Sequence, residues 1–346
     1  TQERPQNPDP GSLRFNTDTK HLEYFRGDNI GWVEVEASDG QLGGGTGSNV
    51  GTGVRGIMGG FHTAGDTIEY ITISTLGDSQ DFGNLSNGRH NSNQNACSET
   101  RMIWGGGYDS GGWRDDIDYI TVSSLGNATD FGNLTEARNG CGAVNDKTRA
   151  VWAGGAHAPD HSGTNTMDYI TMASTGNAVD YGDFDAEKGT ECSVSSSTRG
   201  IWTYNVAPAG SIRYSTISSL GNTSDFGDLD SSSWVSGGGS SATRGIFAGG
   251  YIVNTIQYIT MATTGNSADF GDMSQARFNN RGLSSSTRNV QASGRYYVSP
   301  GFVHSDICDY FQMATLGNAV DFGDMSFLDG NGYSAGNSNG HGGLSG

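Results

Sequence analysis

The stretch that decides the fold is Tyr169-Ile-Thr-Met-Ala-Ser-Thr-Gly176-Asn-Ala-Val-Asp180-Tyr-Gly182. In it a tyrosine is followed seven residues later by glycine and eleven residues later by Asp-Tyr-Gly. The same pattern, ending in Asp-Phe-Gly or Asp-Tyr-Gly, occurs six times at intervals of 44 to 52 residues. Because this period is typical of propeller blades, we predict an all-β chain with six blades. The blades are anchored at Tyr70, Tyr119, Tyr169, Tyr214, Tyr258 and Tyr310.

One repeat, residues 138–184, contains the four strands expected of a blade. Small residues at 140–144 form the first strand, and 148–155, ending in Gly-Gly, forms the second. Residues 166–172 alternate as a third strand should. The Gly-Asn dipeptide after it is typical of a hairpin turn, which leads to a fourth strand through 180–182.

The two ends of the repeat array are complementary. The array starts at Val54 with a second strand, and residues 331–340 have the spacing of a first strand. We therefore expect the C-terminal strand to complete the N-terminal blade and close the ring of blades. Closure would remove the free sheet edges that otherwise promote aggregation.

These features resemble the kelch family of propellers. In that family too, the second strand ends in Gly-Gly and aromatic residues mark the third and fourth strands. The resemblance covers residues 54 to about 340 and implies a six-bladed kelch-like β-propeller. The chain departs from the family in the fourth strand, where Phe or Tyr within Asp-Phe-Gly replaces the kelch tryptophan.

Variation in length is confined to one connection of each repeat. From the Asp of Asp-Phe-Gly to the next second-strand Arg the distance is 19 or 20 residues. From that Arg to the next Tyr it is 15, 18, 20, 15, 14 and 22 residues. We therefore expect the connections between second and third strands to be loops on one face of the propeller, and that face to be the contact surface.

These connections are rich in aromatic residues, which offer a large contact area at a small entropic cost. We predict that they bind a receptor, with the alternative that several of them fold back onto the blades. The candidates are Phe61, His62, Tyr108, Trp113, His157, Tyr204, Tyr251, Tyr296, Tyr297, Phe302 and His304.

Several short motifs are explained better by structure than by chemistry. Asp-Phe-Gly occurs in every repeat without the other kinase motifs, so we interpret it as an aromatic wedge, a turn glycine and an aspartate that bonds turn amides. The glycine-rich 51–56 leads into a strand rather than a helix, and Arg26-Gly27-Asp28 falls at a predicted hairpin turn. His157, Asp160 and His161 are the best metal-ligand candidates, but two histidines in a loop are more often solvated. We predict no enzyme activity, no cofactor and no metal site.

The composition excludes some partners. A net charge of -18 would repel a nucleic-acid backbone, and no apolar run approaches the length of a membrane span. The four cysteines lack metal-ligand spacing, so we expect small buried side chains rather than a disulfide framework.

Residues 1–38 predict a small β-meander adaptor, and the glycine-rich 39–53 predict a linker to the propeller of 54–346. Three short strands are expected around 13–15, 22–25 and 32–35. So small a meander needs a partner to bury its apolar side chains. The expected docking residues are Leu13, Phe15, Leu22, Tyr24, Trp32 and Val33.

The string Gly-Ser-Leu-Arg-Phe-Asn-Thr-Asp-Thr-Lys…Leu-Glu-Tyr…Gly-Trp-Val in residues 11–33 resembles a segment of appendage proteins of tailed bacteriophages, including tail fibres of marine or cyanophage type. The resemblance implies a virion protein on the tail or capsid surface that docks on other virion proteins as a homo-oligomer, a trimer in the case of a fibre. We expect its propeller to bind a host surface glycan or protein. The alternatives are a decoration protein without a receptor role, and a secreted kelch-fold carbohydrate-active or copper enzyme.

Overall fold

The computed structural model describes residues 8–16, 21–25, 32–34, 54–61, 65–90, 94–157, 162–204, 210–230, 234–326 and 334–345. The chain divides into two compact units, Thr1–Gln41 and Leu42–Gly346. The predicted linker 39–53 and the Arg-Gly-Asp motif at 26–28 lie outside the described residues. Within the described ranges, no helix is both long and apolar enough to cross a membrane.

The N-terminal unit contains a three-stranded antiparallel meander, as the sequence predicts. Its strands are β1 (Leu13–Asn16), β2 (His21–Phe25) and β3 (Trp32–Glu34). The backbone register pairs five of the predicted docking positions with one another, namely Leu13 with Tyr24, Phe15 with Leu22, and Tyr24 with Val33. Leu13 is exposed, whereas Trp32 is paired with the buried Phe25, and the two rings lie 5.5 Å apart.

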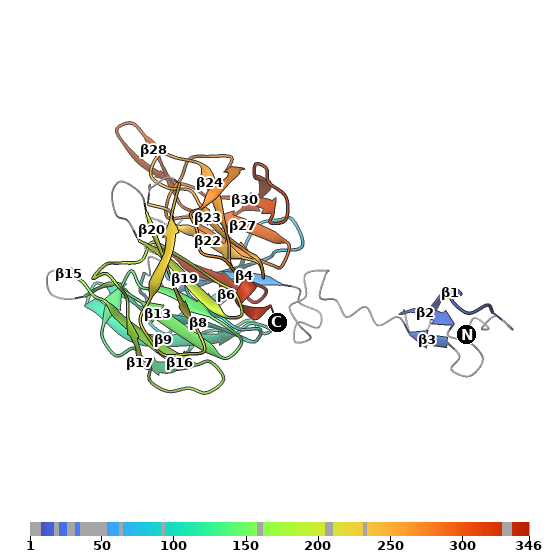
Figure 1. Cartoon of the computed structure of the whole chain (residues 1–346), viewed down its shortest axis with the longest axis horizontal. Coiled ribbons are helices and arrows are strands. Elements are labelled where there is room, and N and C mark those ends of the chain that lie inside the picture. Colours follow the sequence, from blue (N-terminus) through green and yellow to red (C-terminus); the bar gives the residue numbers. More distant parts are fainter. Residues whose placement is uncertain are drawn as a thin grey trace. The chain divides into compact units, whose positions relative to one another are not determined.

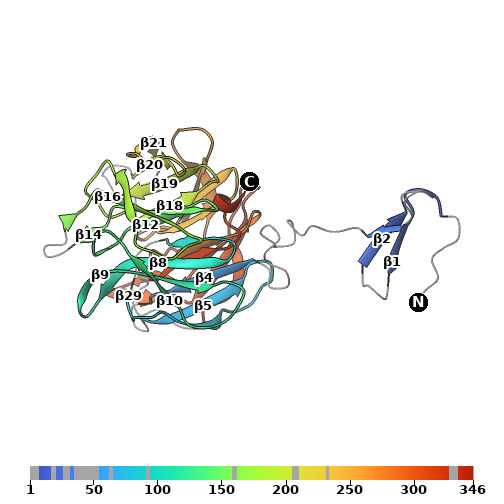
Figure 2. The ribbon, with the colours of Figure 1, turned by 90° about the horizontal axis from the view of Figure 1, so that it is seen from below.

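The described part of the larger unit contains six four-stranded antiparallel sheets, an all-β, propeller-like architecture. Successive sheets lie next to one another in sequence order (Figures 1 and 2). The first three, each with its strands in hydrogen-bonded order, are β32 (Ala335–Ser338), β4 (Arg55–Gly59), β5 (Thr67–Thr72) and β6 (Gln80–Asn84); β7 (Ala96–Cys97), β8 (Arg101–Asp109), β9 (Gly112–Thr121) and β10 (Thr129–Asn133); β12 (Gly142–Asn145), β13 (Arg149–Ala153), β16 (Thr166–Thr171) and β17 (Val179–Asp183).

The other three sheets have the same order. They are β18 (Cys192–Ser195), β19 (Arg199–Tyr204), β20 (Ser211–Thr216) and β21 (Ser224–Asp228); β22 (Gly237–Ser240), β23 (Arg244–Ala248), β24 (Thr255–Thr260) and β25 (Ala268–Asp272); β26 (Arg281–Ser284), β27 (Arg288–Ala292), β30 (Ile307–Gln312) and β31 (Val320–Asp324).

The strand assignments made from the repeat are confirmed. The unit chosen from the sequence forms β12, β13, β16 and β17 in the predicted order. The C-terminal strand β32 pairs antiparallel with β4, as the spacing predicts, and joins the first sheet. A 3-10 helix, η1 (Gly342–Leu344), follows β32. All four cysteines are buried and free.

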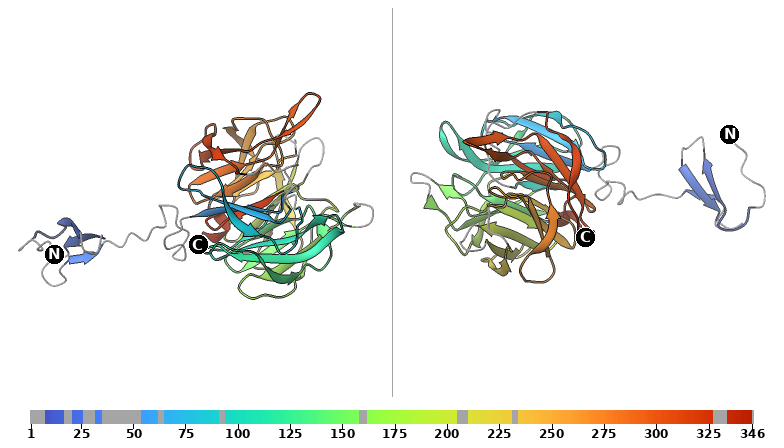
Figure 3. Two further views of the ribbon diagram at one scale, coloured as in Figure 1. Left: turned by 180° about the vertical axis from the view of Figure 1, so that it is seen from behind. Right: turned by 90° about the horizontal axis from the view of Figure 1, so that it is seen from above.

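The connections between second and third strands are not all loops, contrary to the prediction. β8 and β9 run on into one hairpin through Ser110 and Gly111. In the next sheet this connection contains β14 (Ala156–His157) and β15 (Ser162–Gly163), which form a small sheet with β11 (Arg138–Asn139), a strand that precedes β12. In the last sheet the connection folds as a hairpin of β28 (Arg295–Val298) and β29 (Gly301–His304), which projects from the larger unit (Figures 1 and 3).

Arginine and aromatic residues of the repeat join each sheet to the next. The first arginine of each second strand lies over the repeat tyrosine of its own sheet at 4.4–5.0 Å, and the tyrosine packs edge-on against the fourth-strand aromatic. The same arginine donates a hydrogen bond to a backbone carbonyl of the following sheet. The pairs are Arg55 to Val122, Arg101 to Met172, Arg149 to Ile217, Arg199 to Met261, Arg244 to Met313 and Arg288 to Ile73.

A second six-fold contact joins the residue just after each fourth strand to the residue before the repeat tyrosine of the next sheet. The chemistry differs between copies, since a hydroxyl faces a carboxylate in four of them and Asp185 faces Arg213 in another. We call these contacts the latches: Ser326–Glu69, Ser86–Asp118, Thr135–Asp168, Asp185–Arg213, Asp230–Gln257 and Ser274–Asp309.

The Asp-Phe-Gly motif is structural in each sheet, but its aspartate does not act as predicted. The aspartate is exposed in all six copies, while the aromatic ring is buried. The side chain that accepts from a backbone amide is the one after the turn glycine, as when Asn177 Oδ1 accepts from Asn133 N at 3.1 Å. The glycine of Asp-Phe-Gly is required for a different reason. A Cβ on Gly132, at φ +149°, would collide with the carbonyl of the turn glycine of the next sheet, Gly176.

Candidate ligand-binding site

Two of the predicted contact residues are core residues, so the expectation that they lie exposed is wrong. Phe61 is 0% exposed and packs with Val54 and Met58. Tyr204, at 6% exposed, lies in β19 with its ring 5.5 Å from that of Phe184. Both rings fill space between sheets, which is the alternative that the sequence left open.

Other predicted residues lie apart from one another. Tyr108 and Trp113 are half-buried partners across the β8–β9 hairpin, with ring centroids 5.2 Å apart. His157 is half-buried in β14 and lies 3.2 Å from the Ser162 hydroxyl. His62, Asp160 and His161 fall outside the described residues, and among those described no three potential ligands gather as a metal site.

Three predicted residues do come together, with two that the sequence did not single out. We define the aromatic cluster as Trp234, Tyr251, Phe278, Tyr297 and Phe302. Within it, Trp234 lies 5.7 Å from Tyr251, which lies 6.0 Å from Phe302, and Phe302 lies 5.4 Å from Tyr297. Phe278 is buried beneath, while the other four are between 41% and 51% exposed. These rings form a largely apolar platform on the surface.

The β28–β29 hairpin supplies one edge of the aromatic cluster. Tyr297 and Phe302 are cross-strand partners and share a face with Arg295 and His304. The Arg295 guanidinium lies 4.6 Å from the Phe278 ring and 5.2 Å from the Phe302 ring, which holds the hairpin over the cluster. Tyr296 is on the opposite face of the hairpin and does not join the cluster.

A cavity of about 210 Å³ adjoins the aromatic cluster at Trp234. Its walls come from four successive connections between a fourth strand and the next first strand. They are Gly140 before β12, residues 189–191 before β18, Trp234 and Ser236 before β22, and Asn279 before β26. Glu191, Thr190, Ser236 and Asn279 make this cavity polar next to an apolar wall.

The backbone is strained around this cavity and the aromatic cluster. In the described chain, four residues other than glycine have positive φ: Trp234 (55°), Ile252 (63°), Asn279 (57°) and Ser293 (60°). Two of them line the cavity, and Ile252 follows Tyr251 of the cluster. A bulky residue such as Trp234 rarely adopts this conformation, and strain of this kind gathers at functional sites.

Ser236 holds the strained segments in place. Its hydroxyl donates to the Trp234 backbone carbonyl at 2.9 Å and accepts from the Asn279 backbone N–H at 2.9 Å. This bridge ties two cavity-lining connections to each other. The Trp234 backbone is therefore fixed before any ligand arrives.

Glu191 is the one carboxyl among the residues that line the described cavity. Desolvation by burial raises the pKa of Glu191 to about 7. Its backbone amide donates to the Thr203 carbonyl at 2.8 Å, which fixes the chain at this position. A carboxyl with a pKa this far above its ordinary value is typical of a site rather than of a solvated surface.

The residues that sequence reasoning missed lie in connections of constant length. Trp234, Phe278, Glu191 and Asn279 all follow a fourth strand, where the spacing hardly varies. Variation in length therefore does not mark them, although Trp234 is the one tryptophan in such a connection. No protein-family model matches the chain, and no curated protein matches it either.

Proposed function

We propose that the larger unit is a six-bladed kelch-like propeller whose blades close into a ring. The arginine links support this, because the last of them, Arg288 to Ile73 at 2.8 Å, returns to the first sheet. The Ser326–Glu69 latch returns in the same way. The inner strand β32 contacts β26 of the last sheet as well as β7 of the second.

We propose that the protein is a virion appendage of a tailed bacteriophage whose propeller binds a host surface receptor. The observation that carries this is the aromatic cluster, in which four large rings remain exposed on a strained and hydrogen-bonded base. Exposed aromatic groups of this kind mark contact sites. The N-terminal meander, with Leu13 exposed at 65%, is the proposed docking base for other virion proteins and for further copies of the chain.

Binding fits the cavity better than hydrolysis does. Glycoside hydrolysis usually needs two carboxyl groups on either side of the scissile bond. The described cavity residues supply one, Glu191. The proposed role of the site is therefore recognition, without a catalytic step.

The test of receptor binding is adhesion of the fluorescently labelled full chain to a panel of bacterial cells, measured by flow cytometry. We expect saturable binding to a subset of strains. The Tyr297→Ala/Phe302→Ala variant should bind about tenfold more weakly or worse, because it removes two exposed anchors. Leu125→Ala is the matched control, since Leu125 is 58% exposed in the turn between β9 and β10, outside the aromatic cluster. Equal loss in the control would refute the assignment of the contact face.

Assembly on a virion has a separate test. Antibodies raised against the larger unit should label phage particles at the tail or capsid surface in electron micrographs of the phage that carries this sequence. Particles that remain unlabelled, with the chain recovered only in the free fraction, would contradict the appendage proposal.

A further inference from the structure

We propose that the cavity beside Trp234 binds one terminal, uncharged sugar ring of a host surface glycan, with the aromatic cluster supporting the next part of the chain. This inference rests on the proposed receptor-binding function and names the chemical class of the receptor. It is carried by the composition, size, charge and rigidity of the cavity and of the cluster that shares Trp234 with it.

The chemistry of the walls matches the two-sided character of a sugar. A pyranose has an apolar face of C–H groups and a rim of hydroxyl groups. Trp234 offers an exposed aromatic wall, while the side-chain amide of Asn279 and the carboxyl of Glu191 offer donors and acceptors. Apolar and aromatic walls with a few placed polar groups are the usual composition of small-molecule sites.

The size of the cavity limits the size of the ligand that it can bind. At about 210 Å³ it is smaller than the roughly 300–1,000 Å³ of sites for drug-sized ligands. It therefore accepts a single ring rather than a whole oligosaccharide. Further sugar units would leave the cavity past Trp234 and meet Tyr251 and Phe302, whose rings are 6.0 Å apart.

The charge around the cavity selects against acidic sugars. Neither lysine nor arginine is among the described residues that line it, whereas Glu191 is. The chain as a whole carries a net charge of -18. A sialic acid, uronic acid or phosphorylated sugar would bring a negative charge next to the half-buried Glu191 carboxyl and would disfavour its ionised form, which is unfavourable. An uncharged ring has no such cost.

The rigidity of the site reduces the entropic cost of binding. Trp234 and Asn279 are held in a left-handed conformation and tied together through Ser236. A ligand that stacks on a group already fixed loses less free energy to ordering. The strain of a left-handed tryptophan is then explained by the position that it gives the indole ring.

The experiment is saturation-transfer NMR on the full chain, with tryptophan fluorescence for affinities. The probes are galactose, glucose, mannose and N-acetylglucosamine, compared with N-acetylneuraminic acid and glucuronic acid. We expect saturable binding of at least one neutral sugar and weaker or no binding of the acidic sugars. Trp234→Ala should weaken binding at least tenfold, and the control Leu125→Ala, outside the cavity and the aromatic cluster, should leave it unchanged.

Two milder variants protect the test against misfolding. Glu191→Gln keeps the side-chain shape, and Asn279→Gly suits the left-handed backbone. Each should weaken sugar binding several-fold with the thermal unfolding midpoint within a few degrees of the parent. Absence of binding by every neutral sugar, stronger binding of the acidic sugars, or equal effects of Trp234→Ala and Leu125→Ala would overturn the inference.

Failure of the inference and failure of the proposed function are distinguishable. Adhesion to cells without binding of any neutral sugar refutes the sugar site and leaves receptor binding standing. Sugar binding that depends on Trp234, without adhesion to cells or presence on virions, supports the cavity as a sugar site and refutes the receptor function.

Discussion

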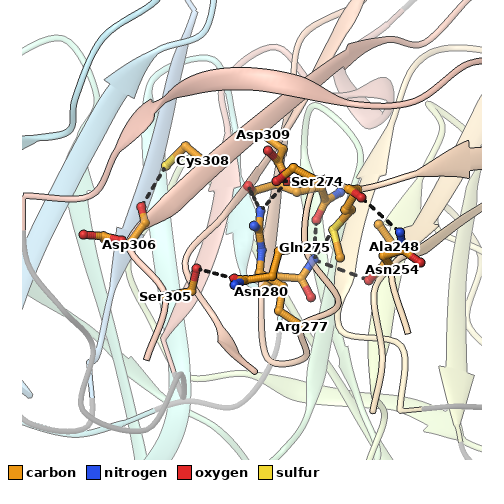
Figure 4. A network of polar contacts seen from close by, with 12 residues as sticks. Ala248, Asn254, Ser274, Gln275, Arg277, Asn280, Ser305, Asp306, Cys308 and Asp309 are labelled. Atoms are coloured by element: carbon orange, nitrogen blue, oxygen red, sulfur yellow. Dashed lines mark hydrogen bonds and ion pairs between the residues drawn. The ribbon is translucent and has the colours of Figure 1, made fainter. Parts of the chain in front are cut away.

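At the residue scale, Arg277 and Asp309 show how the latches hold charges out of water. Arg277 Nη2 lies 3.1 Å from Asp309 Oδ2 and donates to the Gln291 carbonyl at 2.8 Å. Ser274 donates to the same carboxylate through its hydroxyl and its backbone amide (Figure 4). Burial lowers the pKa of Arg277, and Asp309 opposes that shift. Arg89–Asp118 and Arg138–Asp168 repeat this arrangement at two other latches.

Removing one partner of the Arg277–Asp309 pair should therefore be costly. Arg277→Met leaves Asp309 buried without its cation, and we expect a loss of about 3–5 kcal/mol in the free energy of unfolding. Adding Asp309→Asn should restore part of that loss, because no charge then remains buried. Equilibrium denaturation in urea measures both.

The control for this prediction is a more exposed ion pair. Arg114→Met breaks pairs with Asp109 and Asp116 that retain 20–30% of their side-chain exposure. We expect a loss below about 1 kcal/mol there. An Arg277→Met variant no less stable than Arg114→Met would show that the buried pair contributes nothing.

At the element scale, the segment that follows β32 is held by one histidine. His341 Nε2 donates to the carbonyl of Cys97 in β7 at 2.8 Å, and its Nδ1 accepts from the Gly343 amide at 3.1 Å. The contact with Gly343 requires the neutral imidazole, because a protonated Nδ1 cannot accept a hydrogen bond. Desolvation by burial lowers the pKa of His341 to about 4. The segment is thus anchored across sheets by a group that must stay uncharged.

Acid should weaken this anchor. The pKa of an unfolded histidine is about 6.5, so stability is intact above that pH and falls as the pH drops toward 4. The shift corresponds to about 3 kcal/mol. His341→Gln should remove this part of the pH dependence, and His157→Gln, in a half-buried histidine, should not. Thermal unfolding midpoints between pH 7 and pH 4 measure the difference, and parallel curves for parent and His341→Gln would contradict the assignment.

The lengths of the connections between strands explain why the candidate site was only partly predictable. The hairpin residues Tyr297 and Phe302 were found because their connection is the longest of its kind. Trp234 and Glu191 were not, since they lie in connections of constant length. Their proximity arises from neighbouring sheets, which place four connections around one cavity.

At the scale of the whole molecule, negative charges greatly outnumber positive ones. A net charge of -18 produces self-repulsion that destabilises a compact state. Salt screens the buried Arg–Asp pairs at Asp118, Asp168 and Asp309 only weakly, whereas it screens the exposed aspartates of the Asp-Phe-Gly copies strongly. Added salt should therefore stabilise the fold.

We expect the thermal unfolding midpoint to rise by roughly 3 °C or more between 10 mM and 500 mM NaCl at pH 7. Calorimetry provides the measurement, and NaCl is preferred to sulfate salts, which strengthen apolar burial by another route. A midpoint that falls with NaCl would mean that exposed attractive pairs outweigh the repulsion.

The sequence alone determined the repeated four-stranded unit, the place of the C-terminal strand beside β4 and the structural nature of Asp-Phe-Gly. These follow from strand alternation and turn chemistry, which are local and therefore readable along the chain. Only the tertiary structure decided which aromatic rings remain exposed. Phe61 and Tyr204 are buried, while Trp234 and Phe278 join Tyr251 and Phe302, because exposure depends on packing between sheets that are far apart in sequence.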